Sequence, residues 1–318
     1  MRPVLLRTIH LLAAAATLFG ASARAAETAL EAVQVSPSVW YVQGDSGPAS
    51  AANQGFNSNA GFVVTRDSVV VFDTLGTPEL GEALIASVRK QSRLPIKRVV
   101  ISHYHADHYY GLSAFKALGA EIWADRSARG ATQTDAAQAR LAERRRSLAP
   151  WVDETTRLVD PDHFIDGEAR FTQGDLHFRL THIGPAHAPD DLVMLVEDEG
   201  VLFAGDLLFA GRVPFVGDAN TAAWLKAIDR VLAMQPKVLV VGHGTASREP
   251  ARDLQLTRRY LTYLRNTMGE AVANMTDFET AYRSTDWSEF SALPAFEAAN
   301  RRNAYNVYLE MERESLQH

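Results

Sequence analysis

The 318-residue sequence predicts an α/β protein in which two β-sheets pack as a sandwich, with helices outside both sheets. Two observations lead to this prediction. A hairpin-rich β section is followed by βα units, and this order occurs twice before a helical C-terminal end. Two short strands with continuous apolar runs, at 97–102 and 237–244, are typical of strands buried on both faces. A chain of this length can bury a large core, so we expect one domain over residues 26–318.

The individual elements follow from local patterns of apolar, β-branched and turn-forming residues. In the first half we expect a strand at 33–42, a loop at 44–61, a hairpin at 62–73, a helix at 78–92, a strand at 97–102 and helices at 111–120 and 126–148. In the second half we expect strands at about 168–172, 176–183, 191–197 and 200–205, a helix at 221–234, a strand at 237–244 and a wholly helical end at 250–316.

The first 25 residues have the pattern of a secretory signal peptide. Arg2 and Arg7 give a basic start, the stretch 9–21 is apolar, and Ala-Arg-Ala at 23–25 resembles a cleavage site. A membrane anchor is the alternative, but the apolar stretch is shorter than the ~20 residues that a span needs. We therefore expect the mature chain to be periplasmic or secreted, without a stable membrane anchor.

Charge and cysteine content restrict the partners and the ligands. Loss of residues 1–25 removes three arginines and no acidic residue, so the formal net charge moves from −6 to −9. An acidic surface argues against nucleic-acid binding, and we expect a small-molecule substrate instead. The chain has no cysteine, so any metal must be held by histidine, aspartate or glutamate.

A dense group of possible metal ligands follows the apolar strand at 97–102. His103, His105, Asp107 and His108 lie within six positions, where the chain leaves the sheet and a helix begins. An extended backbone places His103 and His105 on one side, and the other two fall in the first helical turn. Imidazole and carboxylate both suit a divalent ion, so one short segment can direct two ligand pairs at two neighbouring points.

Three more candidates occur at the ends of later strands, each beside glycine: His187, Asp206 and His243. Burying such groups without a partner is costly, so their positions after apolar strands indicate a function. Three other histidines lack this context, and we expect them to be ordinary surface or half-buried residues: His163, His177 and His182.

The ordered set His-x-His-x-Asp-His, His, Asp, His resembles the metallo-β-lactamase superfamily over about residues 33–245. The resemblance implies an αββα four-layer sandwich, here with extra C-terminal helices over about 250–318, and two zinc ions per chain in the cleft at the edge of the two sheets. It assigns His103, His105 and His187 to the first ion and Asp107, His108 and His243 to the second, with Asp206 bridging both.

Within the superfamily, Asp206 stands where the best-known β-lactamase subclass has a cysteine. The ligand set is similar to that of the branch with glyoxalase II, lactonases and RNase Z. The stretches HYHADHYYGL, FAGDLLFAGRVPFVGD and PAFEAANRRNAYNVYLEMERE resemble exported bacterial SoxH-like or quinoprotein relay system zinc metallohydrolases. A diiron branch has a carboxylate in place of one histidine of the first cluster, so His105 favours zinc.

The function implied by this resemblance is an exported zinc-dependent hydrolase. A metal-activated hydroxide would attack a small carbonyl substrate, such as an ester, thioester, lactone or β-lactam, with Asp107 and Asp206 as catalytic carboxylates. One alternative is an accessory periplasmic metalloprotein of a quinoprotein or sulfur-oxidation pathway. Another is a true β-lactamase. Nucleic-acid processing suits the fold but not the export signal or the acidic charge.

For residues that could support the metal site, the sequence leaves two interpretations open. Asp73 either orients a ligating histidine or is a turn or helix-cap aspartate. Phe56 and Asn57, in the loop at 44–59, either cover the metals or belong to a solvated loop. Glyoxalase II binds glutathione through a C-terminal helical region, and basic, aromatic and amide residues in the C-terminal helices here could act similarly. We favour the alternative that these residues lie on the solvated faces of packing helices: Arg258, Arg259, Tyr260, Tyr263, Asn300, Arg301 and Arg302.

Overall fold

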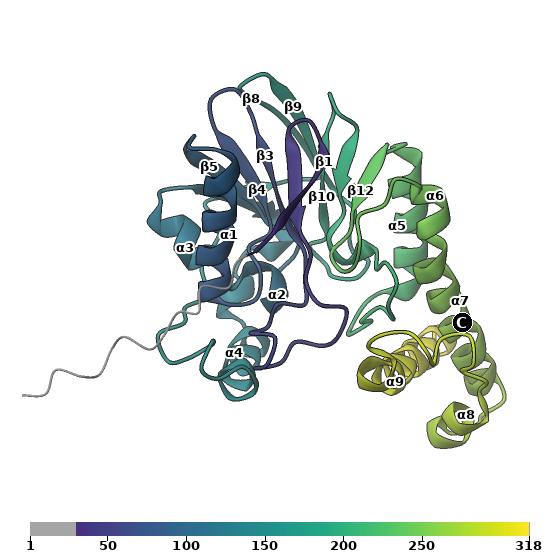
Figure 1. Cartoon of the computed structure of the whole chain (residues 1–318). Coiled ribbons are helices and arrows are strands. Elements are labelled where there is room, and N and C mark those ends of the chain that lie inside the picture. Colours follow the sequence, from purple (N-terminus) through teal and green to yellow (C-terminus); the bar gives the residue numbers. More distant parts are fainter. Residues whose placement is uncertain (1–29, 318) are drawn as a thin grey trace, which may run out of the picture.

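A computed structural model describes residues 30–317 as two packed β-sheets with helices on both outer faces (Figure 1). The first sheet follows chain order: β1 (Ala32–Ser36), β2 (Val39–Val42), β3 (Ala60–Val64), β4 (Val69–Phe72), β5 (Ile96–Val100), β6 (Glu121–Asp125) and β7 (His163–Ile165). The second runs in the order β12 (Val238–Val240), β11 (Val201–Phe203), β10 (Leu192–Val196), β9 (Leu176–His182) and β8 (Glu168–Gln173). The predicted four-layer αββα sandwich is confirmed.

The helices form the two outer layers. Those of the first half are α1 (Pro78–Gln91), α2 (Ala106–Tyr109), α3 (Leu112–Ala117) and α4 (Asp135–Ser147). Those of the second half are α5 (Thr221–Ala233), α6 (Pro250–Asp253), α7 (Gln255–Ala273), α8 (Phe278–Ser284) and α9 (Phe296–Ser315). In Figure 1 α1 and α3 cover one outer face of the sandwich and α5 to α7 the other, while α2 and α4 lie at its lower end.

Three apolar clusters correspond to the three interfaces between the four layers. The middle cluster lies between the sheets and includes Val63 and Phe178. A second cluster joins the first sheet to α1, α3 and α4, through residues such as Leu84 and Leu141. The third joins the second sheet to α5 and α7 and continues into α9, where Val307 is fully buried. The C-terminal helices therefore share one core with the second sheet.

The ends of several strands meet at one edge of the sandwich. β4 and β5 are parallel, so the residues that follow them emerge side by side, and the Asp73 N–H donates to the Val100 carbonyl at 2.9 Å. In the second sheet β11 and β12 are parallel, and β9 runs in the same direction because both β9 and β11 are antiparallel to β10. All the candidate ligands follow the carboxyl ends of these strands.

Several predicted elements differ from the structure. The predicted strand at 33–42 is two strands, because the chain turns at Pro37 and Ser38, and β1 and β2 pair antiparallel. The predicted helix at 126–148 becomes α4 only at Asp135, after short 3-10 turns around Gly130, which has φ 76°. The prediction of a wholly helical C-terminal end was wrong for residues 285–295, which separate α8 from α9.

The expected helix at 111–120 is the shorter α3, preceded by the separate turn α2, and the strands β6 and β7 were not predicted. The signal peptide at 1–25 lies outside the described residues. Among residues 30–317, none of the helices combines the length and the apolar character that crossing a membrane requires.

Candidate metal centre

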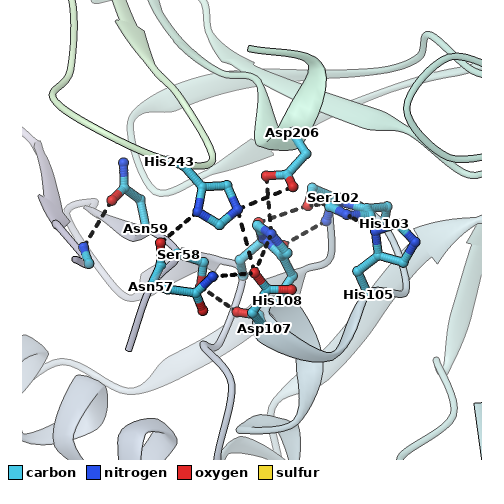
Figure 2. A network of polar contacts seen from close by, with 12 residues as sticks. Asn57, Ser58, Asn59, Ser102, His103, His105, Asp107, His108, Asp206 and His243 are labelled. Atoms are coloured by element: carbon cyan, nitrogen blue, oxygen red, sulfur yellow. Dashed lines mark hydrogen bonds and ion pairs between the residues drawn. The ribbon is translucent and has the colours of Figure 1, made fainter. Parts of the chain in front are cut away.

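The structure brings all seven predicted ligands together at the edge of the sandwich. His103, His105, Asp107 and His108 come from the segment between β5 and α2 and from α2 itself, and the other three come from the second sheet's side. Their side-chain atoms form three groups within 4.8 Å: His103, His105 and His187; His103, His108 and Asp206; and Asp107, His108 and His243. Figure 2 shows most of these side chains pointing toward one another.

The first group consists of three imidazoles. His105 Nδ1 lies 3.0 Å from His103 Nε2 and 2.9 Å from His187 Nε2. A neutral imidazole carries one N–H, and its other ring nitrogen has a lone pair. The three nitrogens that face one another here therefore present mainly lone pairs. Burial lowers the pKa of His103 and His105 well below the ordinary value and that of His187 to about 4. The rings are therefore neutral, which is the form that binds a metal.

The second group combines imidazoles and carboxylates. His108 Nε2 lies 3.2 Å from Asp206 Oδ1, and His243 Nε2 lies 3.2 Å from Asp206 Oδ2 and 3.4 Å from Asp107 Oδ2. Asp206 Oδ2 is also 3.5 Å from His187 Nε2 of the first group. The Asp206 carboxylate therefore lies between the two groups, where a bridging ligand would be.

The donor set fits a pair of divalent cations. His108 Nε2 and Asp206 Oδ1 lie 3.2 Å apart, and both are buried without a hydrogen bond among the described residues, which is costly unless another group binds there. Although burial raises it, nearby His108 and His243 bring the pKa of Asp107 to about 2, and the same histidines hold that of Asp206 well below normal. Ionised carboxylates, together with the neutral imidazoles of the first group, suit zinc and similar ions.

Asp73 lies behind two of the histidines. It follows β4 with φ 61° and is 1% exposed. Its Oδ1 accepts from the Ser102 N–H at 2.8 Å, while its Oδ2 accepts from the Ser102 hydroxyl at 2.8 Å and lies 2.9 Å from His108 Nδ1. Ser102 Oγ is in turn 2.9 Å from His103 Nδ1. Asp73 therefore fixes the Nδ1 proton of His108 directly and that of His103 through Ser102, and leaves both Nε2 atoms facing the centre.

Replacing Asp73 by asparagine should weaken metal binding. Asparagine tolerates the positive φ, but its NH₂ group would face either both the His108 N–H and the Ser102 hydroxyl proton or, in the flipped orientation, the Ser102 backbone N–H. We expect the metal dissociation constant to rise by roughly 10–100-fold, with the fold retained. Competition with a chromophoric chelator measures the affinity, and Asp67→Asn in the exposed β3–β4 turn is the control. Unchanged affinity in Asp73→Asn would show that Asp73 does not orient the ligands.

The loop at 44–59 reaches the centre through its last residues (Figure 2). Asn57 Nδ2 donates to Asp107 Oδ2 at 3.3 Å, and the Asn57 carbonyl accepts from His243 Nδ1 at 2.5 Å. The Ser58 hydroxyl donates to the Asp107 carbonyl. Asn57 is thus buried against two candidate ligands, whereas Phe56 is half-buried and packs against the apolar cluster of the first sheet and its helices.

The remaining histidines and the C-terminal residues lie elsewhere. His163 and His177 are exposed, and His182 is half-buried with Nε2 2.9 Å from the Pro189 carbonyl, as expected for ordinary residues. Tyr260 and Asn300 were wrongly expected on solvated faces. Both are fully buried, and the Tyr260 hydroxyl donates to Asn300 Oδ1 at 2.8 Å. They hold α7 against α9.

The other C-terminal residues connect helices and loops. Tyr263 bonds to the Asp286 carbonyl, Arg258 and Arg259 pair with acidic side chains, and Arg301 pairs with Glu279. The Arg302 guanidinium lies 5.8 Å from the Phe215 ring centre.

Sequence reasoning missed residues that act from behind the ligands. Ser102, directly before the histidine segment, was a visible polar residue at a strand end. Arg212 is buried, with Nη1 3.3 Å from His243 Nδ1, and donates to the Gly47 carbonyl at 3.2 Å. A Cβ on Gly242 would lie 2.0 Å from Asp206 Oδ1, so glycine is needed for the carboxylate to approach the backbone. The glycine beside His243 was the only sequence signal for this contact.

Comparison with known proteins now identifies the family. Residues 53–243 match the family model described as the metallo-beta-lactamase superfamily. The chain belongs to this superfamily. The prediction of a metal-dependent hydrolase is thereby confirmed at the level of the superfamily, which includes relatives named as hydrolases.

Individual relatives are distant. A linear primary-alkylsulfatase of Pseudomonas sp. is 24% identical over 62% of this chain and 44% of its own length. A metallo-beta-lactamase type 2 of Bacteroides fragilis is 23% identical over 59% of this chain and 69% of its own. The solved structure of a sec-alkylsulfatase from Pseudomonas sp. has a TM-score of 0.66 at 19% identity, over 88% of this chain and 50% of that one. The chain therefore spans about half the length of these alkylsulfatases.

Proposed function

We propose that this chain is an exported hydrolase that uses two zinc ions to cleave a small carbonyl substrate, such as an ester, thioester, lactone or β-lactam. The main support is the arrangement of Asp206 between two groups of ligands, with His108 Nε2 and Asp206 Oδ1 buried without a hydrogen bond among the described residues. His103, His105 and His187 would hold one ion, and Asp107, His108 and His243 the other. The Asp206 carboxylate would contact both.

Zinc bound there would lower the pKa of a bound water to about 7 and polarise the substrate carbonyl. The protein's own groups prepare this chemistry. Asp107 is ionised and is the more exposed of the two central carboxylates, so it can accept a hydrogen bond from the attacking water. Asn57 Nδ2 donates to the same carboxylate and limits its movement. Asp73 and Ser102 keep two imidazoles oriented toward the centre throughout.

Sulfate-ester hydrolysis is a second candidate, supported by the two alkylsulfatase relatives. The structural match to the sec-alkylsulfatase covers 88% of this chain, which is more than all the residues that precede α6 could supply. The match therefore includes part of the C-terminal helices. A true β-lactamase and an accessory metalloprotein of a quinoprotein or sulfur-oxidation pathway are the alternatives.

Export to the periplasm or the outside is part of the proposal and rests on the N-terminal pattern of basic, apolar and small residues. The acidic balance of the chain supports a small-molecule substrate rather than a nucleic acid. N-terminal sequencing of the protein recovered from a bacterial periplasm would test the expected cleavage after Ala25.

A hydrolysis screen tests the function. Residues 26–318 would be loaded with zinc and assayed with esters, thioesters, lactones, β-lactams and alkyl sulfates. Turnover of one carbonyl class supports the proposal, and turnover of alkyl sulfates alone replaces it with the second candidate. If no compound is hydrolysed while deletion of the gene impairs growth on alcohols or thiosulfate, the accessory role is favoured instead.

A further inference from the structure

The segment that follows Asp206 lies against the metal centre. Residues 208–220 contain no helix and none of the strands of the two sheets. Near the start of this segment, the Ala210 N–H donates to the His243 carbonyl at 2.9 Å. The Phe209 ring stacks on the His243 imidazole, with the ring centres 5.0 Å apart and the planes 5° from parallel. The segment therefore contacts both the backbone and the ring of one candidate ligand and is continuous with another.

Two further contacts connect the same segment to the rest of the centre. At its far end, the Asn220 N–H donates to the carbonyl of Ala186, directly before His187, at 3.0 Å. In its middle, Arg212 is 4% exposed, and its Nη1 donates at 3.2 Å to the Gly47 carbonyl of the loop that reaches the centre. The position of this segment therefore affects every candidate ligand on the second sheet's side.

Helix α9 provides hydrogen-bond partners for the backbone of this segment. Val213, Pro214 and Val216 are buried, and an irregular buried backbone must find partners outside regular secondary structure. Asn303 of α9 is fully buried, and its Oδ1 accepts from the Val216 N–H at 2.9 Å. Its Nδ2 donates to the Pro214 carbonyl at 2.7 Å. One amide side chain thus pairs with both a donor and an acceptor of the segment.

The contact continues along one face of α9. Asn306 Nδ2 donates to the Gly217 carbonyl at 2.6 Å. Glu310 Oε1 accepts from the N–H of Thr221, the first residue of α5, at 2.9 Å. Because Asn303, Asn306 and Glu310 are separated by three and four positions, they lie in one row on the helix surface. This row of side chains is paired with the backbone of the segment from its middle to its end.

We propose that α9 holds the metal centre in its binding geometry, with Asn303 as a positioning residue that acts on His243 and Asp206 through residues 208–220. Without the Asn303 side chain, an N–H and a C=O of the segment would be buried without partners, so the segment would shift and carry the adjoining ligands with it. Helix α9 lies outside residues 53–243, which match the family model. The inference deepens the proposed function and rests on its two-ion centre.

Zinc affinity tests this role without turnover. Both zinc dissociation constants would be measured by competition with a chromophoric chelator for the mature chain, Asn303→Ala and Asn300→Ala. Asn300 is a matched control, because it is the same residue type on the same helix, is also fully buried and, like Asn303, is bonded to the Tyr260 hydroxyl. Its Nδ2 donates to the Tyr282 hydroxyl at 3.2 Å instead of to the segment. Calorimetry of the metal-free proteins compares their stability.

We expect at least one dissociation constant to rise about tenfold in Asn303→Ala and neither to change in Asn300→Ala, although both variants should unfold at lower temperature. Unchanged constants in Asn303→Ala would overturn the inference. An equal rise in Asn300→Ala would also overturn it, because lost stability alone would then explain the weaker binding. If Asn303→Ala does not fold, Asn306→Ala decides in the same way, since Asn306 is only partly buried and donates to the segment once.

Failure of the inference and failure of the function give different results. Weaker zinc binding in Asn303→Ala alone, without hydrolysis of any compound by the wild type, would retain the role of α9 and remove the proposed function. Hydrolysis by the wild type, with zinc affinity and kcat/KM both unchanged in Asn303→Ala, would retain the function and remove the role of α9.

Discussion

Replacing Asp206 by alanine is expected to reduce kcat/KM by roughly a thousandfold or more, because the change removes the carboxylate that lies between the two groups of ligands. His187→Ala should have a similar effect, since it deletes one of only three imidazoles in the first group. Both variants should bind fewer zinc ions. Steady-state kinetics on the substrate found in the screen, with metal analysis of the same samples, measures both effects.

The control for these variants is His177→Ala. His177 is exposed on β9 and pairs with Asp198, so its loss should change neither metal content nor kinetics. Circular dichroism should show that all three variants retain the fold, because the apolar clusters are untouched. Turnover close to wild type in Asp206→Ala or His187→Ala, with two ions still bound, would contradict the assignment of these ligands.

Removal of metal is expected to abolish activity and to destabilise the fold. Without ions, His108 Nε2 and Asp206 Oδ1 remain buried 3.2 Å apart without a hydrogen bond among the described residues. A ligand that binds only the folded state at about a thousand times its Kd contributes about 4 kcal/mol, so chelation should lower the unfolding midpoint by roughly 10 °C. Differential scanning calorimetry before and after dialysis against a chelator measures this shift.

Addition of zinc should restore both activity and stability, with saturation at two ions per chain. The Asp206→Ala variant, treated identically, should show a smaller shift because it binds metal less well from the start. Saturation at one ion in excess zinc, or an unfolding midpoint that chelation does not change, would contradict the two-ion centre.

The candidate ligands could be predicted from the sequence because each comes shortly after an apolar strand. Such positions are recognisable locally, and parallel strands bring their carboxyl ends to one edge. The sequence left two interpretations of Asp73 open, because its positive φ and its hydrogen bonds to Ser102 depend on the neighbouring strand β5. The four-layer arrangement likewise followed from the order of elements.

Other features depend on contacts between distant segments, which no local pattern encodes. Tyr260 and Asn300 look like surface residues in an amphipathic pattern, but α7 and α9 bury them against each other. The strand prediction at 33–42 failed because the turn at Pro37 and Ser38 is too short to interrupt the β-branched pattern.

The division of ligands between the two sheets has a consequence for folding. The segment after β5 provides two side chains to each proposed ion, and the second sheet's side provides His187 to one, His243 to the other and Asp206 to both. Each ion would therefore cross-link the two halves of the sandwich. A chain in which one sheet has not yet formed offers no complete site, so ion uptake would report the final docking step. Separation of the sheets would release both ions together.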